Sequence, residues 1–156
     1  MHLKPFRLAL CVIAATNFVA AASAQKTPEP ACQSAMSMKA GQLHGEWAVR
    51  FSHPPAGWPE TATLRLERHA EFSESLAGTV NRDLGPAAGT SAIAGDRDEG
   101  MLLLDESSDR ISITGTWNGA MVADSCGKVY QGVWKDTSSN APPDAPDVSF
   151  TLTKRP

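Results

Sequence analysis

The feature that most restricts the fold of this chain is a period-two alternation of apolar and polar residues, repeated in short runs. The first run extends from Leu43 to Phe51, with Gly45, Trp47 and Val49 on the same face and mainly polar residues on the other. Such alternation is typical of a β-strand with one buried and one solvated face. Comparable runs occupy residues 62–67, 76–80, 111–117, 130–134 and 148–153. The segment 101–104 is apolar throughout, which predicts a strand covered on both faces.

Turn-forming residues separate these runs. Residues 53–57, 84–89, 96–100 and 138–146 are rich in proline, glycine or aspartate, and Asn118-Gly119 predicts a tight hairpin because both residues tolerate positive φ. The pattern predicts eight antiparallel strands, one more than the seven runs named above, or nine if residues 120–125 form another. Strands at such short spacing predict an all-β antiparallel sandwich or barrel. We favour an up-and-down β-barrel, because closure removes the exposed sheet edges. Before the first strand, Cys32 to Ala40 could form a short helix that ends at Gly41.

The amino terminus has the three parts of an export signal. Lys4 and Arg7 precede an apolar stretch over residues 8–22, and Ala22-Ser23-Ala24 offers a cleavage site. A membrane-spanning helix needs about 20 apolar residues, more than this interrupted stretch provides. We therefore expect a signal peptide over residues 1–24, a leader over 25–42 and a barrel domain over 43–156. The mature protein is expected to be periplasmic or secreted, with no membrane span.

The cysteines agree with export. Of the three cysteines, Cys11 would leave with the signal peptide, while Cys32 and Cys126 remain. An even number of cysteines in an oxidising compartment predicts a disulfide between them. Two free, buried thiols are the alternative.

The charge of the chain argues against nucleic acid and against anionic membrane surfaces as partners. The formal net charge is −3, and removal of the signal peptide takes away two basic residues and no acidic ones. A protein that binds nucleic acid or acidic lipid headgroups ordinarily presents a basic patch.

A second pattern places glycine between larger residues on one strand face. It occurs four times, as Leu43-Gly45-Trp47, Leu76-Gly78-Val80, Ile113-Gly115-Trp117 and Tyr130-Gly132-Trp134. Glycine at the centre allows sharp coiling of the strand or lets a bulky neighbour lie across it. The large side chains could simply fill the core. Alternatively, Trp47, Trp117, Tyr130 and Trp134 line a site for a small apolar ligand.

An early Gly-x-Trp that opens an all-β meander resembles the calycin group, which includes lipocalins, avidin-like proteins and secreted bacterial metalloprotease inhibitors. The resemblance spans most of residues 43–154 and implies a ligand-carrying barrel. Leu43-Gly45-Trp47 and Leu76-Gly78-Val80 fit two motifs of the avidin-like proteins. Val80 stands where that family would have a tyrosine, so no biotin-binding residues are assigned here.

The inhibitor branch of this group implies another way of acting. Its inhibitory element is an extended amino-terminal segment that enters the protease cleft, and the polar, proline-containing leader begins with Gln25, Lys26 and Thr27. The resemblance implies that these residues would enter the active-site cleft of a target protease. The disulfide of that family closes a much shorter loop than Cys32–Cys126 would.

Sequence signals for catalysis and metal binding are weak. His44, His53 and His69 have no metal-ligand spacing, and neither Cys-x-x-Cys nor Gly-x-Ser-x-Gly occurs. We expect no metal, no cofactor and no enzymatic activity. The predicted function is that of an exported binding protein for a small apolar ligand or for another exported protein. A hydrolase with a site assembled in space, using His53 or His69, is a further alternative.

Overall fold

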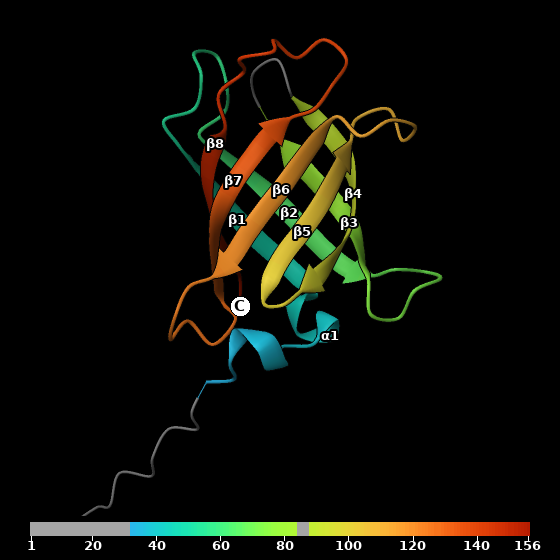
Figure 1. The fold of residues 1–156 in the computed structure, drawn as a ribbon, viewed down its shortest axis with the longest axis vertical. Helices are drawn as coiled ribbons and strands as arrows, with labels where there is room; N and C mark the ends of the chain where they lie inside the picture. The colour runs from blue at the N-terminus through green and yellow to red at the C-terminus, as the bar shows by residue number, and fades with distance from the viewer. Residues whose placement is uncertain (1–31, 84–87) are drawn as a thin grey trace, which may run out of the picture. The chain divides into compact units, whose positions relative to one another are not determined.

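The structure is a computed structural model that describes residues 32–83 and 88–156. These residues form a closed antiparallel barrel of eight strands in sequential order (Figure 1), which confirms the predicted fold class. The expected signal peptide, the leader residues Gln25–Thr27 and part of the predicted 84–89 loop lie outside the described residues. The strands are β1 (Gly45–Ser52), β2 (Thr61–Arg68), β3 (Leu76–Arg82), β4 (Gly89–Asp98), β5 (Met101–Ser107), β6 (Gly115–Met121), β7 (Val129–Asp136) and β8 (Val148–Lys154).

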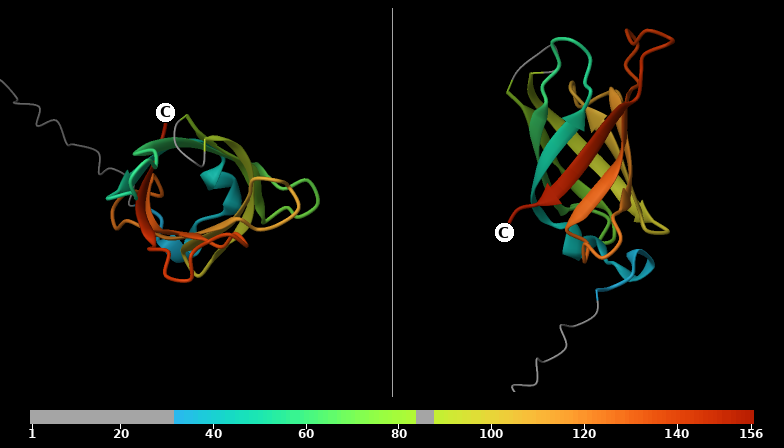
Figure 2. Two further views of the ribbon diagram at one scale, coloured as in Figure 1. Left: turned by 90° about the horizontal axis from the view of Figure 1, so that it is seen from above. Right: turned by 90° about the vertical axis from the view of Figure 1, so that its left-hand side faces the viewer.

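The two ends of the barrel differ. The β1–β2, β3–β4, β5–β6 and β7–β8 connections lie at one end, which we call the mouth. The segment 32–44 lies at the opposite end, together with the β2–β3, β4–β5 and β6–β7 connections (Figure 2). We call this the closed end. None of the helices in residues 32–83 and 88–156 has the length and hydrophobicity of a transmembrane span.

Contacts around Trp47 seal the closed end. The 3-10 helix η1 (Ala35–Ser37) and the helix α1 (Ala40–Leu43) precede β1, so Gly41 lies inside a helix rather than ending one. The Trp47 indole donates a hydrogen bond of 2.9 Å to the carbonyl of Leu43. The ammonium group of Lys154, on β8, lies 5.6 Å from the centroid of the Trp47 ring and donates to the carbonyl of Gln42. The first strand therefore begins at Gly45, two residues later than predicted.

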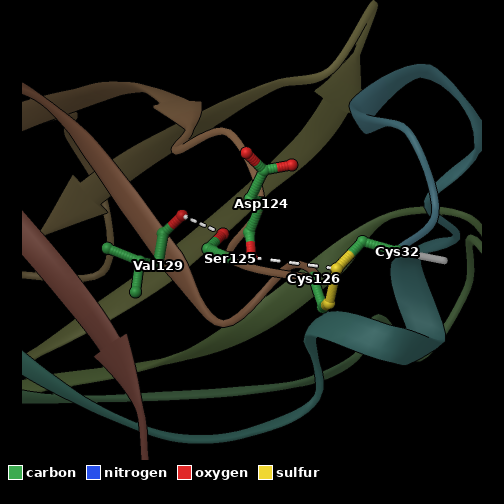
Figure 3. The surroundings of a disulfide bond; sticks show 5 residues. All are labelled: Cys32, Asp124, Ser125, Cys126 and Val129. Carbon is green, nitrogen blue, oxygen red and sulfur yellow. Dashed lines mark hydrogen bonds between the residues drawn. A yellow bond between two sulfur atoms is a disulfide. The ribbon is translucent and has the colours of Figure 1, made fainter. Parts of the chain in front are cut away.

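The predicted disulfide between Cys32 and Cys126 is present in the structure. It joins residues 94 positions apart and ties the segment before η1 to the β6–β7 connection (Figure 3). The carbonyl oxygen of Asp124 lies 3.7 Å from the Cys32 sulfur, and the Ser125 hydroxyl donates to the carbonyl of Val129. The bond fixes the amino-terminal segment to the same end of the barrel that Trp47 seals.

The sequence analysis located no strand at β4, and its prediction of a hairpin turn at Asn118-Gly119 was wrong. The inward-facing positions of β4 include Ser91, Ile93 and Gly95, so only one large apolar residue signals the strand. Asn118 and Gly119 pair with residues of β7 in the middle of β6. Glycine is needed there for packing, because a Cβ at Gly119 would lie 3.0 Å from the Phe150 ring. The residues 120–125 form no separate strand.

Two other strand predictions need correction. Leu102 and Leu104 are buried, but the alternating Met101 and Leu103 are 37% and 36% exposed, so β5 is covered on one face rather than two. The predicted strand over 111–117 begins only at Gly115. Ahead of it, Asp109 accepts hydrogen bonds from the backbone amides of Ile111 and Ser112 and holds a loop.

Glycines let the strands coil tightly enough to close. A Cβ built at Gly132, on β7, would lie 1.9 Å from the carbonyl oxygen of Asn118 on β6. At Gly115 it would lie 2.6 Å from the indole nitrogen of Trp134. Three of the four predicted triplets thus have a steric explanation inside the barrel: Gly78, Gly115 and Gly132 each sit against a neighbour that leaves no room for a side chain.

We predict that Gly132→Ala destabilises the protein by roughly 1–3 kcal/mol, because the backbone of β6 must move to admit the methyl group. Chemical denaturation monitored by circular dichroism measures the loss. Gly41→Ala is the matched control, since a Cβ at Gly41 meets only a His44 carbon at 4.0 Å. Equal stability of the two variants would contradict the steric role of Gly132.

Candidate functional site at the barrel mouth

A buried ion pair lies at the mouth end of the barrel. Arg82 is the last residue of β3 and Glu106 is near the end of β5, and they are 1% and 4% exposed. The two guanidinium NH groups donate to the two carboxylate oxygens of Glu106 at 2.5 and 2.8 Å. This fork-to-fork geometry is the strongest form of an arginine–carboxylate contact. The strand β4 separates β3 from β5, so the pair bridges non-neighbouring strands.

Aromatic side chains surround this ion pair. The Arg82 guanidinium carbon lies 5.5–5.8 Å from the ring centroids of Phe51, Trp58, Trp117 and Trp134. Cations within about 6 Å of an aromatic ring are attracted by its quadrupole. The indole NH groups of Trp117 and Trp134 donate to Glu106 at 3.1 and 3.0 Å. We refer to Phe51, Trp58, Trp117 and Trp134 as the aromatic box.

Arg82 is the main reason why the pKa of Glu106 is lowered. Burial by itself raises the pKa of this carboxyl group, but hydrogen bonds and charge attraction from Arg82, with hydrogen bonds from Ser91 and Trp134, outweigh it and lower the pKa below the ordinary value of 4.5. Within the described residues, the Nε atom of Arg82 has no hydrogen-bond partner. The positive charge of Arg82 is therefore stabilised partly by its hydrogen bonds to Glu106 and partly by the aromatic faces around it.

The strand geometry explains how these residues meet, and it also shows what the sequence analysis missed. Arg82 lies two positions beyond Val80 on the inward face of β3, and Glu106 lies two positions beyond Leu104 on the inward face of β5. Extending the alternation of Leu76, Gly78 and Val80 by one step would have marked Arg82 as inward-facing, whereas the apolar run 101–104 gave no alternation that could mark Glu106. Polar residues at those positions interrupt the apolar signal, so the predicted strands ended too early. The loop residue Trp58 carried no periodic signal.

A hollow of about 450 Å³ opens beside the ion pair. Such a volume lies within the range of small-molecule sites. Its walls combine two indoles, the buried carboxylate and several hydroxyl groups from all four mouth connections or the strand ends next to them. The lining residues are Trp58, Ala88, Gly89, Thr90, Ser91, Glu106, Ser108, Thr114, Trp134, Asp136 and Ser138.

The structure separates the four aromatic residues that were predicted to line a ligand site. Trp117 and Trp134 belong to the aromatic box, and Trp134 also lines the hollow. Trp47 and Tyr130 meet edge to face at the closed end, with ring centroids 5.8 Å apart. Trp47, Trp117 and Tyr130 are fully enclosed, while Trp134 is 5% exposed.

The histidines considered for catalysis lie apart. His53 follows β1 at the mouth, whereas His69 follows β2 at the closed end. His44 follows α1, also at the closed end, and its Nε2 has no hydrogen-bond partner within the described residues. No group of three potential metal-ligating side chains occurs in the part of the chain that the structure describes.

Comparison with known proteins adds no assignment. No protein-family model matches the sequence, and no curated protein matches it. The function must therefore be inferred from the fold and from the mouth.

We predict that Glu106→Gln lowers the free energy of unfolding by about 3–5 kcal/mol at neutral pH, because it leaves the Arg82 charge buried without a counter-ion. The lowered pKa of Glu106 means that its contribution is complete above pH 4.5 and is lost as the pH falls through the pKa of the folded protein. The difference between wild type and variant should therefore shrink in acid.

Denaturant titrations between pH 3 and pH 8 measure this dependence. Glu71→Gln is the control, because Glu71 is exposed in the β2–β3 connection and forms no ion pair among the described residues. A constant difference between wild type and Glu106→Gln across this pH range would contradict an ionised Glu106.

Proposed function

We propose that this protein is an exported, non-enzymatic binding protein of calycin-like architecture, which takes up a small ligand at the barrel mouth. The observation that carries the proposal is the hollow of about 450 Å³ above a preorganised, buried Arg82–Glu106 pair. Replacing a buried ion pair by apolar residues of similar volume is often neutral or stabilising. A buried ion pair next to an open hollow is therefore better explained by recognition than by stability alone.

The position of the ligand differs from the simplest carrier arrangement. The largest enclosed side chains of the barrel interior include Trp47, Trp117, Arg82 and Tyr130, which occupy the space a deeply bound ligand would need. Two indole surfaces and several hydroxyl groups line the hollow at the mouth. These groups suit a ligand with both an apolar face and hydrogen-bonding groups, seated near the rim.

Two features support export and a binding role. The amino-terminal signal pattern is present in the sequence, and the disulfide between Cys32 and Cys126 suits an oxidising compartment. The Glu106 carboxylate at the mouth already accepts hydrogen bonds from Arg82 and from two indoles. Its charge is therefore neutralised within the barrel, and the group is not placed to transfer a proton to a substrate. This arrangement supports binding in preference to catalysis.

A protein partner is a second candidate, favoured by the β5–β6 connection. Ile111 and Ile113 are 91% and 50% exposed there. Asp109 holds the loop by accepting hydrogen bonds from two backbone amides and from the hydroxyls of Ser107 and Ser112. Hydrogen bonds from Ser112 and from the Ile111 amide also lower the pKa of Asp109. A rigid loop that exposes two isoleucines fits the apolar surface of another exported protein.

We predict that the mature protein, purified without denaturation, carries a small molecule detectable by native mass spectrometry. Trp58→Leu should weaken its binding about ten-fold, or about 1.4 kcal/mol, because this variant removes an indole wall of the hollow. Phe72→Leu is the control, since Phe72 is 60% exposed in the β2–β3 connection at the closed end. Equal retention of the molecule by both variants would place binding elsewhere.

For the partner candidate, we predict that replacing Ile111 and Ile113 by serine leaves the melting temperature nearly unchanged and abolishes capture of a specific exported protein. Both side chains are solvent-exposed to a large extent, so the fold loses little buried area. Cross-linking in the intact cell envelope, followed by mass spectrometry, measures capture. Identical cross-links from wild type and the double variant would contradict a role for this loop.

A further inference from the structure

The charges around Trp58 identify the class of ligand that the mouth favours. Trp58 is partly exposed and lines three separate hollows, of about 450, 360 and 490 Å³. The charged residues that line these hollows are all acidic, with no lysine, arginine or histidine among them. They are Glu60, Asp83, Glu106, Asp136 and Asp144.

Only one of these carboxylates is neutralised in the described part of the chain. Glu106 is paired with Arg82. Asp136 accepts a hydrogen bond of 2.9 Å from the backbone amide of Ser138 but forms no ion pair among residues 32–83 and 88–156. Within the same residues, Glu60, Asp83 and Asp144 form none either. The mouth therefore has an excess of negative charge next to an indole surface.

The hollow of about 360 Å³ combines this charge with an apolar lining. Three prolines, an alanine and a valine join Trp58 and Trp134 there, and the only charged groups in its lining are Asp136 and Asp144. The indole rings of Trp58 and Trp134 lie 4.5 Å apart between centroids, at 52°. An apolar wall with two carboxylates complements a ligand that has a hydrophobic part and a positive charge.

The barrel itself contains an example of this recognition. The Arg82 guanidinium is held by a carboxylate and by aromatic faces, and Trp58 and Trp134 are two of those faces. The same two indoles continue into the hollows, where unpaired carboxylates take the place of Glu106. Attraction between an aromatic face and a cation adds to charge attraction when water is partly excluded.

We infer that the ligand of the mouth is a small organic cation, an ammonium or guanidinium group carried on an apolar or aromatic skeleton. The inference rests on the proposed binding function and adds the charge of the ligand. The hydrophobic skeleton would lie against Trp58 and Trp134, with the cationic group directed to Asp136 and Asp144.

Three probes of similar size and different charge test this inference. Phenethylammonium, 2-phenylethanol and phenylacetate are titrated into the mature protein at pH 7, with tryptophan fluorescence and saturation-transfer NMR as readouts. We expect phenethylammonium to bind at least ten-fold more tightly than phenylacetate, with the alcohol in between. Raising the salt concentration from 50 to 500 mM should weaken the binding of phenethylammonium several-fold, because salt screens exposed charges. The affinity for 2-phenylethanol should not change.

Charge variants locate the effect. The double variant Asp136→Asn, Asp144→Asn should bind phenethylammonium more weakly, by roughly two- to five-fold for each carboxylate removed, which is what an exposed ion pair contributes to affinity. Its affinity for 2-phenylethanol should not change. Asp98→Asn combined with Glu71→Gln removes the same charge at the closed end and should have no effect. Melting curves establish that both double variants are folded.

The outcomes separate the two proposals. Equal or tighter binding of phenylacetate or 2-phenylethanol would overturn the cation inference and leave the proposed binding function intact. Failure of all three probes to bind at millimolar concentration would also overturn the cation inference. A neutral or anionic molecule found by native mass spectrometry would do the same. The absence of any copurified ligand, with Trp58→Leu and Phe72→Leu indistinguishable, would count against the proposed function itself.

Discussion

The interaction on which the mouth of this barrel depends is the buried contact between Arg82 and Glu106. Taking two charges out of water is costly, and the cost is offset only if both are well satisfied. Here the carboxylate accepts from the guanidinium and from two indoles, and the guanidinium lies among four aromatic rings. The position of each aromatic side chain at this end is thereby linked to the charge pair.

The two ends of the barrel use related chemistry for different purposes. At the closed end, Lys154 lies over Trp47 and binds the carbonyl of Gln42, while the Cys32–Cys126 disulfide holds the amino-terminal segment in place. At the mouth, a cation also lies over indole rings, but the neighbouring walls are open hollows. The proposed function depends on this difference, because the bidentate contact between Arg82 and Glu106 holds the side chains around the mouth hollow in place. A preorganised site loses less entropy when a ligand arrives.

Much of the fold could be predicted because alternation carries a strong physical signal. The runs at Trp47, Val80, Trp134 and Phe150 correctly marked strands, and three of the four glycines between large residues correctly marked places of close approach. The errors came where inward-facing side chains are small, or where a glycine that could form a turn instead makes room for a neighbouring side chain. The strand β4 has Ser91 and Gly95 facing inward, and Gly119 makes room for Phe150 instead of forming a turn.

The sequence by itself determined the all-β class of the fold and limited the mature chain to one possible pair, Cys32 and Cys126, because periodicity and cysteine number are local or countable properties. It favoured a closed barrel and a disulfide, and the structure contains both. Only the tertiary structure decided the candidate site. Arg82, Glu106 and Trp58 come from two non-adjacent strands and a loop, and their encounter depends on strand register around a closed barrel. No spacing along the chain encodes that encounter, since it is barrel closure that brings these three side chains into one desolvated cluster.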